Sequence, residues 1–116
     1  MKHLLECLDA TARRWPERPA FGDEAGTLTW AEVALAVQRV GTALARQGVQ
    51  RRPVALYLDH RVPCLLTMLG TLAAGGFYTV LDTAQPPERV RRITDQLAPV
   101  LLVTDEEHRE IGRAHV

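Results

Sequence analysis

A run of five apolar residues, 54–58, constrains the fold of this chain more than any other segment. Its sequence is Val-Ala-Leu-Tyr-Leu, with Arg52 and Pro53 before it and Asp59 after it. A strand with one wet face alternates apolar and polar residues, whereas an unbroken apolar run of this length is typical of a strand covered on both faces. Such strands occur in parallel sheets, whose neighbours are joined by crossover helices. The run therefore predicts βαβ units around it.

The residues downstream supply two such units. Residues 62–74 predict a crossover helix that is apolar nearly all round, and Gly75 and Gly76 end it. A strand over residues 77–81, an amphipathic helix over Pro87–Leu97 and a strand over residues 100–103 follow. Since βαβ crossovers are right-handed in about 98% of cases, the expected fold is α/β, a three-stranded parallel sheet with flanking helices. At least one edge of that sheet is left unpaired, and we expect something outside it to cover that edge.

The upstream third predicts two further helices. Residues 3–15 have helical apolar spacing until Pro16 and Pro19 stop the helix, and a short strand at residues 20–21 and a turn at residues 23–26 follow. Thr29 and Glu32 then have the spacing of a capping box, so a second helix is expected to begin at Trp30. Gly48 is expected to end it.

Composition excludes several classes of function. The chain has 116 residues, enough for one domain, and 14 basic residues balance 14 acidic ones, which disfavours nucleic acid and membrane surfaces as partners. Gly75 and Gly76 break the longest apolar stretch before it can span a bilayer, and no signal peptide is evident, so we expect a cytoplasmic protein. Cys7 and Cys64 lack a CxxC partner or a nearby His cluster and are interpreted as two buried, reduced thiols without chemistry.

Three stretches, in this order, resemble the adenylation domain of nonribosomal peptide synthetases, within the adenylate-forming superfamily. Residues 15–21, W-P-E-R-P-A-F, are similar to the opening Pro-Asp/Glu-x-x-Ala segment, and residues 28–33, L-T-W-A-E-V, resemble the first core motif, L-[TS]-Y-x-E-L. Residues 72–82, L-A-A-G-G-F-Y-T-V-L-D, resemble the second, L-K-A-G-x-A-Y-V-P-L-D, and residues 86–90 continue like the following segment. Ala73, Val80, Thr83 and Gln85 depart from the family's Lys, Pro, Pro and Tyr.

The resemblance implies an incomplete N-terminal subdomain of an adenylate-forming enzyme at residues 1–105, followed by a charged tail at 106–116. It implies that ATP and magnesium serve the parent enzyme through residues further along, so we assign no catalytic, cofactor-binding or metal-binding residue here. The expected partners are the remainder of the adenylation domain or a complementary synthetase protein. The family forms an aminoacyl-AMP from ATP and an amino acid and transfers the aminoacyl group to a carrier thiol. We expect this chain to be inactive alone.

The residues themselves point the same way. The sequence has no Ser and a single Lys, Lys2, and it lacks the glycine-rich phosphate-loop patterns. Gly75 and Gly76 are the nearest candidate for binding phosphate, but we favour a helix stop. Asp59 and His60 follow a predicted strand, where an Asp-His pair can act in catalysis; capping of the next helix is favoured instead.

Two other polar groups receive structural interpretations. Asp82 also follows a strand, and together with Asp59 it suggests a metal or phosphoacceptor site. The sequence offers these two residues no Lys, Ser or Thr partner at a usable position, so we expect loop-capping roles for them. The cluster Arg89, Arg91 and Arg92 is balanced by acidic residues on its own helix and is interpreted as a solvated face.

Two alternatives to a fragment of an adenylating enzyme stay open at this point. The first is an interaction module kept for docking to another synthetase protein, or one half of a split enzyme. The second is an independent small nucleotide-binding protein with Asp59, His60 and Asp82 lining its crevice.

Overall fold

The structure is a computed structural model, and it describes residues 2–59 and 61–105. His60 and the predicted tail 106–116 lie outside the described residues. The elements, in chain order, are α1 (Lys2–Arg14), β1 (Pro19–Asp23), β2 (Gly26–Thr29), α2 (Trp30–Arg46), β3 (Pro53–Tyr57), α3 (Val62–Ala73), β4 (Phe77–Val80), α4 (Pro87–Leu97) and β5 (Leu101–Thr104).

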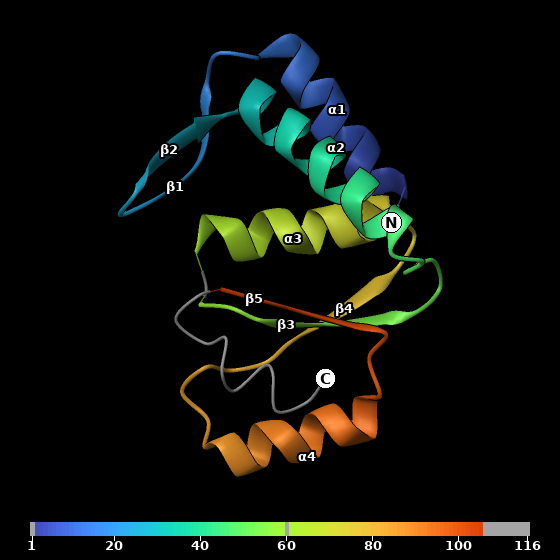
Figure 1. Ribbon diagram of the computed structural model, residues 1–116. Coiled ribbons are helices and arrows are strands. Elements are labelled where there is room, and N and C mark those ends of the chain that lie inside the picture. The colour runs from blue at the N-terminus through green and yellow to red at the C-terminus, as the bar shows by residue number, and fades with distance from the viewer. Residues whose placement is uncertain (1, 60, 106–116) are drawn as a thin grey trace.

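Strand β3 lies at the centre of a three-stranded parallel sheet in the order β4-β3-β5, which confirms the predicted pair of βαβ units (Figure 1). Val54 is in register with Tyr78 of β4 on one side and with Leu101 of β5 on the other. Along the chain the first crossover leads from β3 to β4, and the second returns past β3 to β5. Because the two crossovers run in opposite directions across the sheet, right-handedness places their helices on opposite faces.

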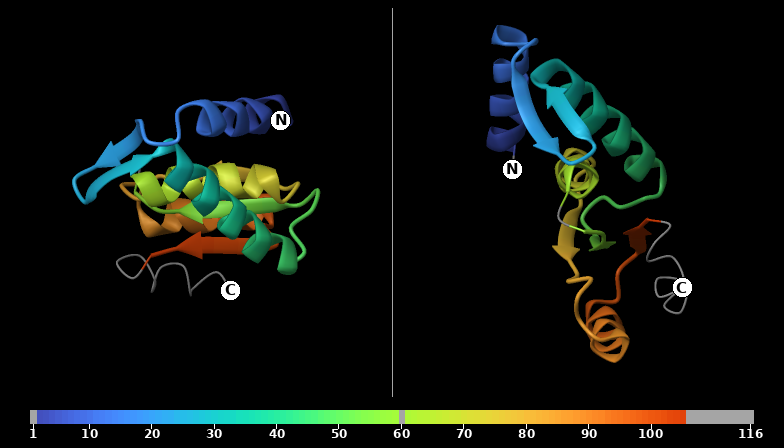
Figure 2. Two further views of the ribbon diagram at one scale, coloured as in Figure 1. Left: turned by 90° about the horizontal axis from the view of Figure 1, so that it is seen from above. Right: turned by 90° about the vertical axis from the view of Figure 1, so that its left-hand side faces the viewer.

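Both faces of β3 are consequently buried. Val54 and Leu56 point to the face covered by α2 and α3, while Ala55 and Tyr57 point to the face covered by α4. None of these four side chains is more than 1% exposed. Figure 2 shows α3 and α4 on opposite sides of the sheet, with α1, α2 and the β1–β2 hairpin beyond α3. The apolar run that opened the sequence analysis is therefore the common core of two layers of helix.

Helices α2 and α3 approach each other closely at two glycines. A Cβ added at Gly70 would lie 2.8 Å from the Cβ of Val40, and one added at Gly41 would lie 3.1 Å from the Cβ of Ala73. Helix α2 begins with the predicted capping box, in which the Glu32 N–H donates to Thr29 Oγ1 (3.2 Å) and the Thr29 N–H donates to Glu32 Oε1 (2.9 Å). The cap and the close contact together set where α2 starts and how it lies over α3.

A β-hairpin replaces the single short strand that was predicted near residue 20. Strand β1 pairs antiparallel with β2, with Phe21 opposite Leu28 and Asp23 opposite Gly26. The predicted turn at residues 23–26 is present, and its Ala25 N–H donates to Asp23 Oδ1 at 2.8 Å. Strand β2 was missed because its four residues, G-T-L-T, are too few to show the alternation of apolar and polar positions that indicates a strand.

The same aspartate caps a helix far along the chain. The prediction that Asp59 or His60 caps the helix after β3 is wrong for Asp59. The N-cap residue of α3 is Arg61, and the Arg61 side chain makes no capping hydrogen bond. The Val62 N–H instead donates to Asp23 Oδ2 at 3.0 Å. These backbone donors to the carboxylate, Val62 first and then Ala25, hold the pKa of Asp23 below its ordinary value.

Two properties of the outer surface bear on partners. Within the described residues, β4 and β5 pair with β3 only, so each has a free edge, as the sequence predicted for at least one of them. None of the described helices combines the length and apolar content that crossing a bilayer requires.

We expect Gly70→Ala to lower the free energy of unfolding by about 1–3 kcal/mol, because its methyl group would overpack the contact with Val40. Urea denaturation measures the change. The double variant Val40→Ala/Gly70→Ala should recover part of the loss, since the smaller side chain makes room. A Gly70→Ala protein as stable as the parent would contradict this account of the α2–α3 contact.

Asp23→Asn should change how stability depends on pH. Since the folded-state pKa of Asp23 is lowered, its carboxylate stabilises the fold above the unfolded pKa, about 4, and this contribution is lost as pH falls through the folded value. The melting temperature of the parent should therefore fall more steeply in acid than that of the variant. Glu24→Gln is the matched control, because its exposed carboxylate contacts the Arg61 side chain and caps no helix in the described part of the chain. Equal pH slopes for parent and Asp23→Asn would refute the role of this cap.

Candidate functional site

The carboxyl ends of β3, β4 and β5 meet at one edge of the sheet, where ligands of open α/β folds bind. Asp59 follows β3, Asp82 follows β4 and Asp105 follows β5. The Thr83 hydroxyl donates to Asp59 Oδ1 at 2.7 Å and so ties the loop after β4 to the loop after β3. The Thr104 hydroxyl donates to the Tyr57 carbonyl oxygen at 2.8 Å. The polar groups at this edge are thus engaged in joining loops and strands.

The structure corrects the interpretation that Asp59 has no threonine partner, and it agrees with the loop-capping role expected of Asp82. Asp59 does have a threonine partner, which sequence reasoning missed because Thr83 lies 24 residues away and replaces a Pro of the resembling motif. The expected loop-capping role of Asp82 is observed, since its Oδ1 accepts the Ala84 N–H at 2.9 Å. His60 lies outside the described residues, so its pairing with Asp59 stays a prediction.

The electrostatics of this edge disfavour a polyphosphate. Burial raises the pKa of the Tyr57 phenol, and the carboxylates of Asp59 and Asp82 raise it further. Two carboxylates thus lie close enough to act on the Tyr57 phenol, and negative charge of this kind repels phosphate groups. In the described part of the chain no three His, Cys, Asp or Glu side chains gather as a metal site would require.

Gly75 and Gly76 end α3 and have no free donors for a phosphate. The Gly75 N–H donates to the Leu72 carbonyl oxygen and the Gly76 N–H to that of Thr71, both at 3.0 Å. With φ of +82° at Gly75, these two bonds form a Schellman motif. A Cβ at Gly76 would lie 2.9 Å from the Val49 carbonyl oxygen, so the glycine here serves close packing of backbone. The helix-stop interpretation is confirmed.

The other residues singled out in the sequence lie on α1, α3 and α4. Arg89, Arg91 and Arg92 are all exposed on α4, in agreement with a solvated face. The prediction that both cysteines are buried is confirmed for Cys64 and wrong for Cys7, which is exposed on α1. Within the described residues neither of them forms a disulfide. Burial raises the pKa of the Cys64 thiol, which keeps it protonated and unreactive at neutral pH.

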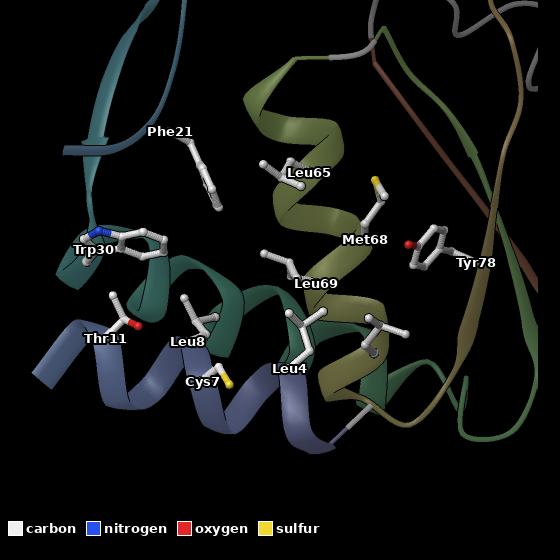
Figure 3. Close-up of a pocket in the computed structure, with 11 residues that line it drawn as sticks. Leu4, Cys7, Leu8, Thr11, Phe21, Trp30, Leu65, Met68, Leu69 and Tyr78 are labelled. Carbon is white, nitrogen blue, oxygen red and sulfur yellow. The ribbon is translucent and has the colours of Figure 1, made fainter.

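An apolar groove of about 370 Å³ is the feature that sequence reasoning did not find (Figure 3). Helix α3 forms its floor, α1 forms one wall, and Tyr78 of β4 stands at the opposite wall. Phe21 and Trp30 close one end with rings packed edge to face, their centroids 5.5 Å apart. Among the described residues, no charged side chain lines the groove. We call this surface the α1–α3 groove.

The groove exists because α3 is only partly covered. Sequence periodicity predicted a buried crossover helix, yet the buried positions of α3 are the small or polar residues Cys64, Thr67, Gly70 and Thr71. Its large apolar side chains, including Leu65, Leu69 and Leu72, are half-buried and line the groove. A helix that is apolar all round needs cover on every side, so the uncovered leucines were a signal available in the sequence.

Comparison with known proteins identifies the family. The model of the AMP-binding enzyme family matches residues 8–115. Syringomycin synthase SyrB1 of Pseudomonas syringae pv. syringae is 33% identical over 103 residues, which are 88% of this chain and 17% of that protein. Nonribosomal peptide synthetase 5 of Gibberella zeae is 34% identical over 103 residues, 87% of this chain and 1% of that protein.

A solved structure agrees in fold as well as in sequence. The crystal structure of the nonribosomal peptide synthetase FmoA3, in a form with α-methyl-L-serine-AMP bound, superposes with a TM-score of 0.85 at 30% identity, covering 92% of this chain and 12% of that one. The chain thus spans less than a fifth of the length of these relatives. By family match, sequence identity and fold, this chain belongs to the AMP-binding enzymes and forms part of an adenylate-forming domain of the nonribosomal peptide synthetase type.

Proposed function

We propose that this chain is a structural layer of an amino-acid-activating adenylation domain that works in the cytoplasm, and that it is inactive without the rest of that domain. The complete domain would join ATP and an amino acid into aminoacyl-AMP, release pyrophosphate and then pass the aminoacyl group to a carrier thiol. One observation carries the proposal: a family-matched sheet with a fully buried centre and, within the described residues, two free edges. Such a layer has a packed core, but the outer edges of its sheet lack partner strands within the described residues.

The chemistry of adenylation supports placing the reaction elsewhere. Attack of a carboxylate on the α-phosphate of ATP needs positive charge or backbone N–H donors around a crowded polyphosphate. Here the N–H groups of Gly75 and Gly76 are committed to α3, and the carboxylates of Asp59 and Asp82 follow two of the strands. These features do not suit a polyphosphate, and within the described residues no three His, Cys, Asp or Glu side chains gather as metal ligands. We therefore propose that ATP and magnesium bind residues outside this chain.

The alternative of an independent nucleotide-binding protein has less support. It needs Asp59 and Asp82 free to face a ligand, but Asp59 accepts a hydrogen bond from the Thr83 hydroxyl at 2.7 Å and Asp82 accepts one from the Ala84 N–H at 2.9 Å. The alternative of a docking module or split-enzyme half has the α1–α3 groove in its favour, because an apolar surface of this kind marks an interaction site. A pull-down from the native lysate that recovers no synthetase protein would count against it.

The isolated chain should not catalyse amino-acid-dependent exchange of pyrophosphate into ATP, and titration with ATP or AMP should give no saturable signal. The reason is that the backbone donors nearest to a phosphate-binding pattern are already bonded within the fold. Full-length FmoA3 with α-methyl-L-serine serves as the positive control for the assay. Exchange by the pure chain above the no-enzyme background would overturn the proposal.

Supplying the missing part should restore activity. FmoA3 lacking the segment that aligns with this chain should be inactive alone and should recover α-methyl-L-serine-dependent exchange when coexpressed with this chain, since the two share a fold at a TM-score of 0.85. Coexpression with Gly70→Ala, which weakens the layer itself, is expected to recover less activity. A stable complex without exchange would argue against the proposed function.

A further inference from the structure

We propose that the α1–α3 groove is the surface on which the remainder of an adenylation domain docks, through apolar side chains that fill it. This inference rests on the proposed function and names the place where the partner binds. Three observations carry it: the chemistry of the lining, the position of the groove beside a free sheet edge, and the size of the relatives that contain this layer.

The lining selects an apolar occupant. Side chains from α1 and α3 face one another across the groove in Figure 3, among them Leu4, Leu8 and Leu69. Leu4 is 48% exposed, and the described lining includes no charged residue to attract a nucleotide, a nucleic acid or an acidic peptide. Covering an exposed apolar groove with an apolar side chain removes apolar surface from water and so lowers the free energy.

The groove continues into a free strand edge. Tyr78 lines the groove and belongs to β4, whose outer edge has no partner strand within the described residues. Phe77, next to it on the same strand, is 52% exposed. A polypeptide that fills the groove therefore also reaches unpaired backbone N–H and C=O groups. A small apolar molecule would cover the groove and leave that edge bare.

The relatives supply the polypeptide. The matching layer makes up 12% of the FmoA3 chain and keeps the same fold there over 92% of this chain. The same layer thus exists within a much longer chain that has material to cover it. A second copy of this chain fits less well, because its large exposed apolar side chains outside the groove lie singly on different elements, such as Leu35 on α2 and Val100 before β5.

Cys7 reports directly on the occupancy of the groove. It lines the groove and is exposed, whereas Cys64 is buried, so a maleimide should label Cys7 selectively in the free chain. In the complex with the truncated FmoA3, the labelling rate of Cys7, followed by peptide mass spectrometry, should fall about tenfold or more, because the thiol then reacts only after local opening. A chain carrying Arg39→Cys, an exposed position on α2 away from the groove, controls for general effects of complex formation.

Leu69→Gln tests the same surface without a label. The side chain of Leu69 is half-buried, so the free variant should unfold in urea close to the parent. Its affinity for the truncated FmoA3 should drop about tenfold or more, since an amide would be buried against apolar side chains. Leu35→Gln, at an apolar position that is 46% exposed and outside the groove, should bind like the parent.

The outcomes separate this inference from the proposed function. If Cys7 in the complex is labelled as fast as in the free chain and Leu69→Gln binds like the parent, the groove is not the docking surface, even if exchange activity is restored. Protection of Cys7 without exchange activity supports the groove and counts against the function. Concentration-dependent protection in the chain alone, together with a dimeric mass, would assign the groove to a second copy, and failure of the two folded parts to associate would also overturn the inference.

Discussion

Burial of β3 on both faces is the constraint on which the rest of this structure depends. With Val54, Ala55, Leu56 and Tyr57 all at most 1% exposed, neither face of the strand can be left to water. The backbone groups of the strand are in turn satisfied by parallel neighbours on both sides. Because parallel neighbours need crossovers of one hand, α3 and α4 are forced to opposite faces, and the whole layer follows from one short apolar run.

How much of this was predictable depended on how local the interaction is. The bounds of α4, Pro87–Leu97, match the prediction, and so do the capping box at Thr29 and the stop at Gly75, since each is specified by residues a few positions apart. The cap of α3 was not predictable in this way, because Asp23 and Val62 are 39 residues apart. Nothing in the local pattern could say that a hairpin would bring that carboxylate to the start of a distant helix.

The contacts at the candidate site were not predictable from the sequence. The lack of Ser and the single Lys2 led us to assign no catalytic or cofactor-binding residue, and that assignment stays a prediction. The hydrogen bond from Thr83 to Asp59 and the α1–α3 groove both arise from elements that are far apart in sequence. For the groove, the pattern on α3 told which side chains are apolar, but the layout of α1, α2 and the hairpin decided which of them stay uncovered.

Residues 72–82, the segment that most resembles the family, have structural roles in this fold. Leu72 lines the groove, Gly75 and Gly76 close the Schellman motif, and Asp82 caps its own loop through the Ala84 N–H. Each of these roles shapes the layer. Packing and chain reversal are enough to constrain a motif of this kind, so it can mark a family without taking part in the reaction. The free edges and the groove are where the layer would support the rest of the domain.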